Sequence, residues 1–247
     1  MSRSGVGHSY TAIGVVVLLL LFVPLTEAKP TRLTLACAAN FSATMNKLVT
    51  LFELQTKEVM DIRVSVGSSG SLATQIQHGA PYDVFLSADK HYVELLTQAG
   101  FGHDRARYAM GELVLYSLDK SPHGLEQVLM NTTKATVAIA NPKHAPYGRA
   151  AQQILQRHSA TPKRLVKGTS VLQAFQYVES GHARYGLIAK SLLKPGFKGQ
   201  WFDIPAHWYD PIEQHALLLA EHPAARAFFD FIQSDDAQQL IKASGYR

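Results

Sequence analysis

The stretch that decides the fold is VSVGSSGSLATQIQHGAPYDVFLSAD, residues 64–89. An apolar run ends in a turn of small residues, and a helical pattern begins at that turn before a second apolar run follows. Small residues leave the backbone N–H groups of the turn uncovered, and Ser68, Ser69 and Ser71 add hydroxyl groups. Because a helix N-terminus carries free N–H donors and partial positive charge, this turn is a candidate anion site.

Strand-like and helix-like segments alternate on both sides of this stretch. We expect strands at 32–37, 61–66, 83–86, 113–118, 135–140, 184–189 and 212–219. We expect helices at 41–57, 69–78, 90–99, 147–158 and 170–180, and a helical tail at 224–243. The segment 194–209 is rich in proline and glycine, and we expect it to be irregular. This order favours an α/β fold with doubly wound parallel sheets.

The length of the chain predicts two lobes joined by a hinge. The last strand and the helical tail have no third lobe to join, so the simplest topology returns them to the first lobe. The chain then crosses between the lobes near 109–113 and near 205–212, which allows hinge motion about a cleft. We expect 1–28 to be a signal peptide, 29–110 with 212–247 to form lobe 1, and 111–211 to form lobe 2.

The first 28 residues are typical of a secretory signal. Arg3 precedes the apolar run AIGVVVLLLLFV at 12–23, and Pro24 ends it. The run suits a signal peptide and is short for a bilayer span of roughly 20 residues. Small residues place the cleavage site after Ala28. A cleaved signal predicts a periplasmic or secreted protein, and an uncleaved anchor is the alternative.

Composition excludes several classes of function. The only cysteine, Cys37, lies in an apolar run, so an intrachain disulfide is impossible and we expect a core position. The net charge of +5 is scattered without a basic run, which argues against nucleic-acid binding but would help to attract an anion. The 11 histidines form no HExxH motif or other close ligand pair, so we expect no protein side chain to ligate a metal directly.

Four places share one local pattern, in which an apolar run is followed by small or polar residues and then by a helix. They lie at 38–40, 67–70, 141–148 and 168–171, two in each predicted lobe. One such turn is usually only a helix cap. In doubly wound folds, however, ligands gather at the carboxyl ends of the strands, where these helix starts lie. Four of them facing one cleft would supply N–H donors from both sides.

These donors suit a fully ionised oxyanion. Charge-assisted hydrogen bonds contribute about 1.5–3 kcal/mol each, so several are needed to hold a buried anion. None of the four segments contains Asp or Glu, so a protonated anion such as hydrogen phosphate finds no acceptor for its proton. Arg149 lies beside the third turn, but its neighbours predict a solvated helix face. Sulfate, molybdate and tungstate all remain open at this point.

Three motifs carry a family resemblance: SSGSLATQIQHGAPYDVFLSAD, NPKHAPYGRAA and YDPIEQHALLL. They resemble the periplasmic molybdate-binding proteins (the ModA family) of ABC transporters, and the resemblance covers nearly all of the chain after the signal. It implies a type II periplasmic binding protein fold of two hinged α/β lobes. It also implies binding of molybdate, and of tungstate, in the interlobe cleft, with delivery to a membrane ABC permease. No other cofactor is implied, and we expect a monomer because both lobes must stay free to move.

The resemblance assigns four oxyanion-binding residues. Ser69 would give its hydroxyl and its backbone N–H, and Tyr147 and Val171 would give their backbone N–H groups. Asn40 stands in the first turn, where many members have serine. Molybdenum would be bound as molybdate through these residues, without a direct bond from the protein to the metal.

Two departures from the family pattern leave the choice of anion open. Ala39 cannot supply the hydroxyl that some members have before the Asn, and Ala189 stands where many have a tyrosine. Because these changes and Asn40 can alter the size of the cavity, the alternative is the same fold and role for sulfate, vanadate or another oxyanion. Titration with each anion distinguishes these readings.

An enzyme is the other class of function considered. A secreted hydrolase could use Ser68 or Ser69 as its nucleophile. The G-x-S-x-G elbow is not met, because Gly70 directly follows Ser69. No His–Asp pair is marked by spacing either, so we expect a binding protein.

Overall fold

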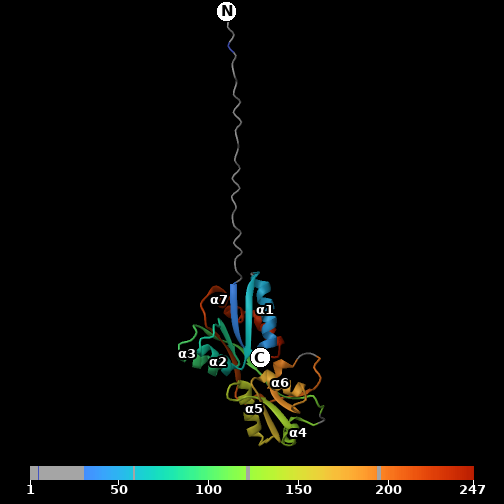
Figure 1. The fold of residues 1–247 in the computed structure, drawn as a ribbon. Coiled ribbons are helices and arrows are strands. Elements are labelled where there is room, and N and C mark those ends of the chain that lie inside the picture. The colour runs from blue at the N-terminus through green and yellow to red at the C-terminus, as the bar shows by residue number, and fades with distance from the viewer. Residues whose placement is uncertain (1–4, 6–30, 58, 121–122, 194–195) are drawn as a thin grey trace, which may run out of the picture.

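The computed structural model describes residue 5 and residues 31–57, 59–120, 123–193 and 196–247. The predicted signal peptide at 1–28 therefore lies, apart from residue 5, outside the described residues. In the described part of the chain, no helix combines the length and the apolar character that crossing a membrane requires. The strands form two five-stranded sheets, and each sheet carries its own helices, so that two lobes lie end to end (Figure 1).

Lobe 1 is built on the sheet of order β2-β1-β3-β10-β4. Its strands are β1 (Thr31–Ala38), β2 (Met60–Gly67), β3 (Val84–Ser87), β4 (Arg105–Gly111) and β10 (Ile212–Leu218). Its helices are α1 (Ser42–Thr56), α2 (Ser69–Gln77), α3 (Lys90–Gln98), α7 (Pro223–Phe231) and α8 (Asp235–Ala243). A short 3-10 turn, η1 (Ala39–Phe41), joins β1 to α1. β1 runs parallel to β2 and β3, whereas β10 runs antiparallel to β3 and β4.

Lobe 2 is built on the sheet of order β7-β6-β8-β5-β9. Its strands are β5 (Leu113–Ser117), β6 (Thr136–Ala140), β7 (Arg164–Gly168), β8 (Tyr185–Ala189) and β9 (Gln200–Asp203). Its helices are α4 (Leu125–Asn131), α5 (Pro146–Arg157) and α6 (Val171–Glu179), with 3-10 turns η2 (Thr132–Lys134), η3 (Lys190–Leu192) and η4 (Ala206–Trp208). β6 is parallel to β7 and β8, and β5 is antiparallel to β8 and β9. The two sheets therefore follow the same plan.

The sheets are mixed rather than wholly parallel, because each carries an antiparallel strand that enters from the hinge. Sequence patterns missed β4, β7, β9 and α4, and the predicted tail is divided into α7 and α8. β9 lies inside the segment 194–209, so the prediction of an irregular segment is wrong for these four residues, whereas residues 196–199 and 204–209 contain no strand. Its side chains alternate only between exposed and partly buried at the edge of the sheet, a pattern that gives little hydrophobic signal.

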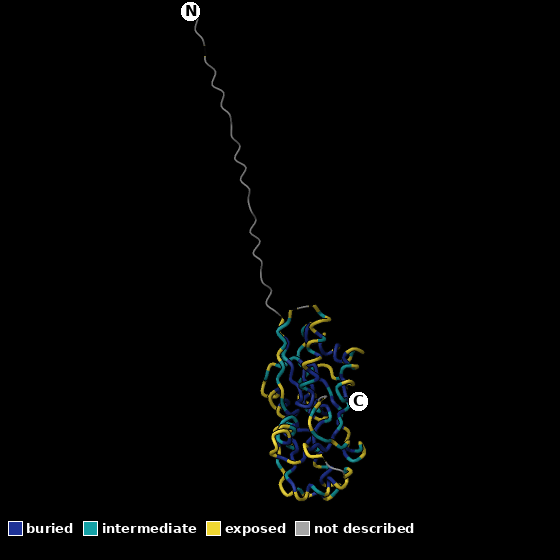
Figure 2. Tube along the Cα trace, turned by 90° about the vertical axis from the view of Figure 1, so that its right-hand side faces the viewer, coloured by how far each residue is buried: buried dark blue, intermediate teal, exposed yellow. Residues whose placement is uncertain are grey.

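Each lobe has its own hydrophobic core. Figure 2 shows the buried segments running through the inside of both lobes. On one face of the lobe 1 sheet, α1, α7 and α8 cover a cluster that includes Leu35, Phe41 and Cys37. Cys37 has no exposed surface, and burial raises the pKa of its thiol well above the usual range. The predicted core position of Cys37 is confirmed.

The lobes are joined by two short connections. β4 passes into β5 through the single residue Glu112, and residues 204–211 connect β9 to β10. The C-terminal residue supports the first connection, because Met110 and Arg247 exchange two backbone hydrogen bonds of 2.6 and 3.0 Å. β10 has an irregular register between Gln214 and His215, close to this junction. The two connections therefore hold one end of the lobe 1 sheet against one end of the lobe 2 sheet.

Candidate functional site

A small cavity lies where the ends of the two sheets meet. It is lined by Ala38, Ala39, Asn40, Ser68, Ser69, Ala88, Ala145, Pro146, Tyr147 and Val171. The structure therefore brings together all four residues that the sequence predicted for the site: Asn40, Ser69, Tyr147 and Val171. The cavity measures about 10 Å³, close to the minimum that one water molecule needs. A tetrahedral oxyanion is larger than one water molecule, so the lining residues must move apart to admit one.

The four residues stand at four helix starts, each of which follows a strand. Asn40 lies in η1 after β1, and Ser69 begins α2 two residues after β2 ends. Tyr147 lies in the first turn of α5, and Val171 begins α6 shortly after β7. The first N–H groups of an α-helix have no acceptor within the helix, so these starts supply free backbone donors. α5 begins with Pro146, which has no N–H, and Tyr147 is therefore its first backbone donor.

The serines of the second turn divide their roles. Ser68 caps α2, because its Oγ accepts from the backbone N–H of Ser71 at 3.3 Å and pairs with the Ser71 hydroxyl at 2.7 Å. Ser69 is buried, and its Oγ accepts from the backbone N–H of Ala88 at 2.9 Å. Since that contact uses a lone pair of Ser69 Oγ, the hydroxyl proton remains available as a donor. Ser69 thus has the chemistry of an anion-binding residue and Ser68 that of a cap.

Asn40 is held by side chains behind the cavity. Its Nδ2 donates to Gln214 Oε1 at 2.9 Å and to the Tyr246 hydroxyl at 3.0 Å, which occupies both amide hydrogens. The Tyr246 hydroxyl in turn donates to the backbone carbonyl of Asn40 at 2.9 Å. The side-chain NH₂ of Asn40 is therefore committed to its neighbours. The donor that Asn40 can still offer to an anion is its backbone N–H.

Gln214 connects Asn40 to the other lobe. Gln214 has no exposed surface, and its Nε2 donates to the Tyr147 hydroxyl at 3.3 Å. The Tyr108 hydroxyl donates to Gln214 Oε1 at 3.0 Å. We call Asn40, Tyr108, Tyr147, Gln214 and Tyr246 the floor network. Sequence reasoning missed Gln214, because it stands between Glu213 and His215 in the strand IEQHALL, and nothing in this polar run marks it as buried.

The floor network carries no formal charge. Burial raises the pKa of the hydroxyls of Tyr108, Tyr147 and Tyr246 well above the usual range of tyrosine. These side chains are therefore neutral at physiological pH. The ten residues that line the cavity include no Asp, Glu, Lys, Arg or His. Within the described part of the chain, no group of three or more His, Cys, Asp or Glu side chains is placed to hold a metal ion.

Charged groups stand instead at the rim of the cleft. Arg149 is partly solvated, as predicted, but its guanidinium also forms an ion pair with the Asp89 carboxylate of lobe 1, which the sequence did not indicate. Asp89 is 8% exposed, and its Oδ1 also accepts from the backbone N–H of Tyr92 at the start of α3. Helical periodicity shows that a face is polar, but it cannot show that the face points at another lobe.

Ala39 and Ala189, the two departures from the family pattern, lie at different distances from the cavity, and only Ala39 lines it. Ala39 lines the cavity and offers only a methyl group there. Ala189 is fully buried at the end of β8 and is not among the lining residues. The donors at the cavity are thus backbone N–H groups and one oriented hydroxyl.

Comparison with known proteins assigns the family. Residues 33–247 match the family described as "Bacterial extracellular solute-binding protein". The chain is 38% identical to the molybdate-binding protein ModA of Azotobacter vinelandii over 232 residues, covering 89% of this chain and 91% of that protein. It is 36% identical to the molybdate-binding protein ModA of Rhodobacter capsulatus over 220 residues, covering 85% and 86%.

A solved structure shares the fold. The periplasmic molybdate-binding protein of Azotobacter vinelandii superposes with a TM-score of 0.82 at 35% identity, covering 87% of this chain and 98% of that one. This likeness confirms the predicted type II fold of two α/β lobes, and the matched relatives are named as binding proteins. The chain belongs to the bacterial extracellular solute-binding protein family.

Proposed function

We propose that this protein binds molybdate, and also tungstate, in the cavity between its lobes. The observation that carries the proposal is the convergence of Asn40, Ser69, Tyr147 and Val171, from four helix starts, on one small cavity. The names of the relatives, which are molybdate-binding proteins, support this choice of anion.

The chemistry of the cavity favours a fully ionised oxyanion. Ser69 offers a hydroxyl proton, and the helix starts offer backbone N–H groups, whereas no carboxylate lines the cavity. Each charge-assisted hydrogen bond contributes about 1.5–3 kcal/mol. Hydrogen phosphate would bring a proton that no lining carboxylate can accept, so it should bind much more weakly. The anion is held by neutral donors and helix N-termini, without a salt bridge.

We further propose that the protein works in the periplasm, as a monomer, after cleavage of residues 1–28. It would deliver the anion to a membrane ABC permease, and it would need no cofactor besides its ligand. It would act by binding and release rather than by catalysis. The two connections between the lobes support this role, because they permit the cleft to open and close around the ligand.

A second candidate is the same role with sulfate or vanadate as the ligand. Asn40 and Ala39 favour it, because they line the cavity at positions where the family resemblance implies hydroxyl-bearing residues in other members. The anions differ in size, so the cavity that Asn40 and Ala39 shape decides between them.

Calorimetric titration tests the proposal. The protein without residues 1–28 is titrated with molybdate, tungstate, sulfate and phosphate. We expect heat with molybdate and tungstate at micromolar protein. Absence of heat with molybdate ends the proposal, and tighter binding of sulfate replaces it with the second candidate.

The Ser69→Ala variant tests the site itself. It removes the hydroxyl donor and also leaves the backbone N–H of Ala88 without its acceptor. We expect molybdate affinity to fall by about 1–3 kcal/mol, or about 5- to 150-fold. Ser180→Ala, at an exposed serine after α6, is the matched control and should bind like the wild type. Unchanged affinity in Ser69→Ala would remove Ser69 from the site.

A further inference from the structure

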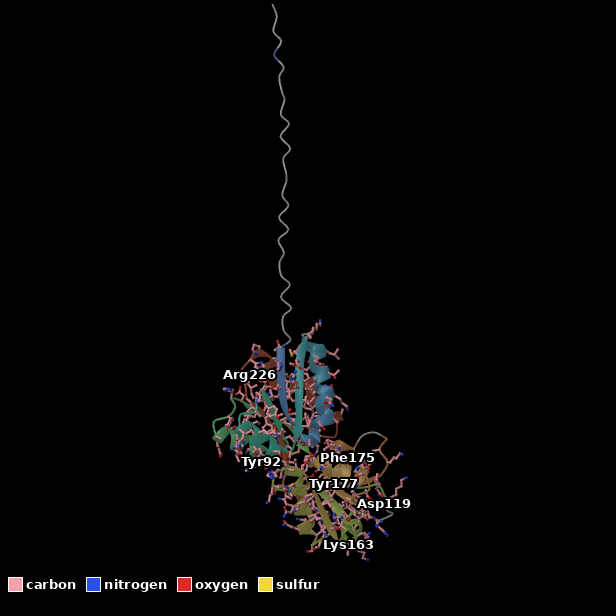
Figure 3. The ribbon with its side chains drawn as sticks, viewed as in Figure 1. Tyr92, Asp119, Lys163, Phe175, Tyr177 and Arg226 are labelled. Atoms are coloured by element: carbon pink, nitrogen blue, oxygen red, sulfur yellow. The ribbon has the colours of Figure 1, made fainter. Side chains whose placement is uncertain are left out.

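The lobes also contact each other outside the cavity, along one edge of the cleft. The backbone N–H of Gly70 donates to the carbonyl of His144 at 2.9 Å. The Tyr92 hydroxyl donates to the carbonyl of Lys143 at 3.0 Å. Each contact joins lobe 1 to lobe 2, and Figure 3 shows Tyr92 beside the boundary between the lobes.

Arg149 reinforces the same edge. Its guanidinium pairs with Asp89 and also lies over the ring of Tyr92, 5.6 Å from the ring centroid. A guanidinium in that position gains a cation–π contact in addition to the ion pair. We call the six residues of these contacts the latch: Gly70, Asp89, Tyr92, Lys143, His144 and Arg149.

The latch residues are chain neighbours of the cavity residues. Gly70 follows Ser69, and Asp89 follows Ala88, whose N–H orients the Ser69 hydroxyl. Lys143, His144 and Arg149 flank the cavity-lining residues 145–147. Because these segments are continuous, the latch contacts form only when the two walls of the cavity face each other. Cavity closure and latch formation are therefore one geometrical event.

The packing at Gly70 shows how close this contact is. A Cβ added there would lie 2.5 Å from the Tyr92 hydroxyl oxygen and 3.0 Å from the Cα of His144. Only glycine allows lobe 2 to approach the start of α2 so closely. The latch is thus a packed interface and not a chance meeting of long surface side chains.

The ion pair makes opening of the cleft electrostatically unfavourable. Opening the cleft would remove Arg149 from Asp89 and leave a carboxylate beside the anion-binding turn without its counter-charge. The carboxylate would keep its contacts with the Tyr92 N–H and the Ser87 hydroxyl, both within lobe 1. The pair therefore favours the closed form specifically, and not the folding of lobe 1.

We propose that the latch residues Arg149, Asp89 and Tyr92 hold the lobes closed and set the rate at which the bound oxyanion leaves, without touching the anion. They are positioning residues. The inference rests on the proposed function, because it concerns release of that ligand. The cavity would then determine which anion binds, and the latch would determine how long the anion stays bound.

Stopped-flow displacement of molybdate, followed by the intrinsic fluorescence of Trp201 and Trp208, tests the proposal. Arg149→Gln removes the charge but keeps the length of the side chain, and we expect the dissociation rate to rise about tenfold while the association rate stays within about twofold. Arg164→Gln, at an exposed arginine of β7, is the matched control and should release molybdate like the wild type. Equal dissociation rates in the two variants overturn the proposal.

Two readouts separate a latch from a merely structural role. Salt screens an ion pair whose arginine is partly exposed, so wild-type dissociation should quicken with ionic strength, and Arg149→Gln should weaken this dependence. Asp89→Asn keeps a capping side chain at the start of α3 but removes the charge. Adding it to Arg149→Gln should produce no further increase in the dissociation rate, since both break one pair. Additive effects would contradict the latch.

Lobe separation can be measured without any ligand. Small-angle X-ray scattering at low salt should give a larger radius of gyration for Arg149→Gln than for Arg164→Gln. If the wild type binds none of the four oxyanions, the proposed function fails, and scattering alone decides on the latch. In that case identical scattering profiles overturn it.

Discussion

The floor and the rim of the cleft are built from opposite kinds of polar group. The floor network is neutral and almost wholly buried, and hydrogen bonds connect its amides and phenols. The rim carries the ion pair of Arg149 and Asp89, where the arginine side chain is 38% exposed. Charge is thus absent where the anion would bind and present where the lobes meet solvent. The comparison teaches that recognition and closure can be altered separately.

The physical reason lies in desolvation. A buried formal charge at the floor would lose its hydration, and a carboxylate there would also favour a protonated oxyanion over a fully ionised one. At the rim, water remains close enough to stabilise separated charges when the cleft opens. An unpaired charge at the floor would therefore resist closing, whereas the paired charges at the rim stay close to water in both the open and the closed form.

Replacing Gln214 should have the largest effect. Gln214→Met keeps the length of the side chain but removes the partner of the Tyr147 hydroxyl and one partner each of Asn40 and Tyr108. Buried polar groups left unsatisfied cost about 1–3 kcal/mol each, so we expect the free energy of unfolding to fall by about 2–4 kcal/mol. Urea denaturation measures it.

Gln75 offers the matched control for that substitution. Its Oε1 accepts from the Tyr82 hydroxyl in an exposed pair. Gln75→Met should change the free energy of unfolding by less than about 0.5 kcal/mol. Equal losses in Gln75→Met and Gln214→Met would show that the floor network is no more important than a surface contact.

The hinge beside the floor should give the next largest effect. A Cβ on Gly111 would overlap the Tyr147 hydroxyl and lie 2.9 Å from Gln214 Nε2. Overpacking of this kind costs about 1–3 kcal/mol. Because Tyr147 belongs to lobe 2, the overlap should disfavour closure, and we expect molybdate affinity to fall about 5- to 150-fold in Gly111→Ala. Calorimetry measures it.

Gly124 provides a comparison without crowding. Nothing lies within 4 Å of a Cβ built on it, and it stands at the start of α4. Gly124→Ala should therefore bind molybdate with wild-type affinity. A Gly111→Ala variant that also binds normally would mean that Tyr147 and the hinge are not coupled.

Sequence patterns predicted the part of the site that depends on local structure. The small-residue turns before Asn40, Ser69, Tyr147 and Val171 each lead into a helix start, because turn and capping chemistry depends on residues a few positions apart. The strand order near the hinge was harder, because β4 and β10 pair as antiparallel neighbours from distant parts of the chain. The alternating order of strands and helices indicated two α/β lobes, and this part of the fold was predictable.

The residues that sequence patterns missed have distant partners. Asn40 and Gln214 meet across 174 positions, and Arg149 and Asp89 across 60. Nothing near Arg149 in the sequence distinguishes a helix face in water from one that faces another lobe. Gln214 lies in a run of three polar residues, so the sequence does not show that it alone is buried in a hydrogen-bond network. Local turn chemistry is predictable, and contacts between lobes are not.

An exposed contact beside the rim should have only a small effect. Gln153 Nε2 donates to Asp210 Oδ2 at 2.6 Å, and the Asp210 backbone N–H donates to Gln153 Oε1 at 2.9 Å. Both groups are solvent-accessible, so Gln153→Ala should lower the free energy of unfolding by about 0.5 kcal/mol. Urea denaturation is again the measurement. A loss comparable to that of Gln214→Met would erase the distinction between the floor and the rim.

A change of pH between 7 and 9 should have the smallest effect on molybdate affinity, because the floor network stays neutral over this range. Burial raises the pKa of Tyr108 and Tyr147, and it lowers the pKa of His215, the next residue along β10 from Gln214. All three side chains therefore stay neutral across this range. We expect molybdate affinity, measured by calorimetry at pH 7, 8 and 9, to change by less than about twofold. A tenfold change would reveal a titrating group and contradict the neutral floor.

Above neutral pH, stability should fall at the alkaline end. The unfolded chain loses its tyrosine protons near pH 10, whereas the folded protein holds those of Tyr108 and Tyr147 more tightly. The unfolded state therefore binds fewer protons above pH 10, and the free energy of unfolding falls as pH rises. Below pH 10 this contribution is fully present. Urea denaturation at pH 8 and pH 11 checks the sign, because greater stability at pH 11 would require tyrosines that ionise more easily in the folded protein.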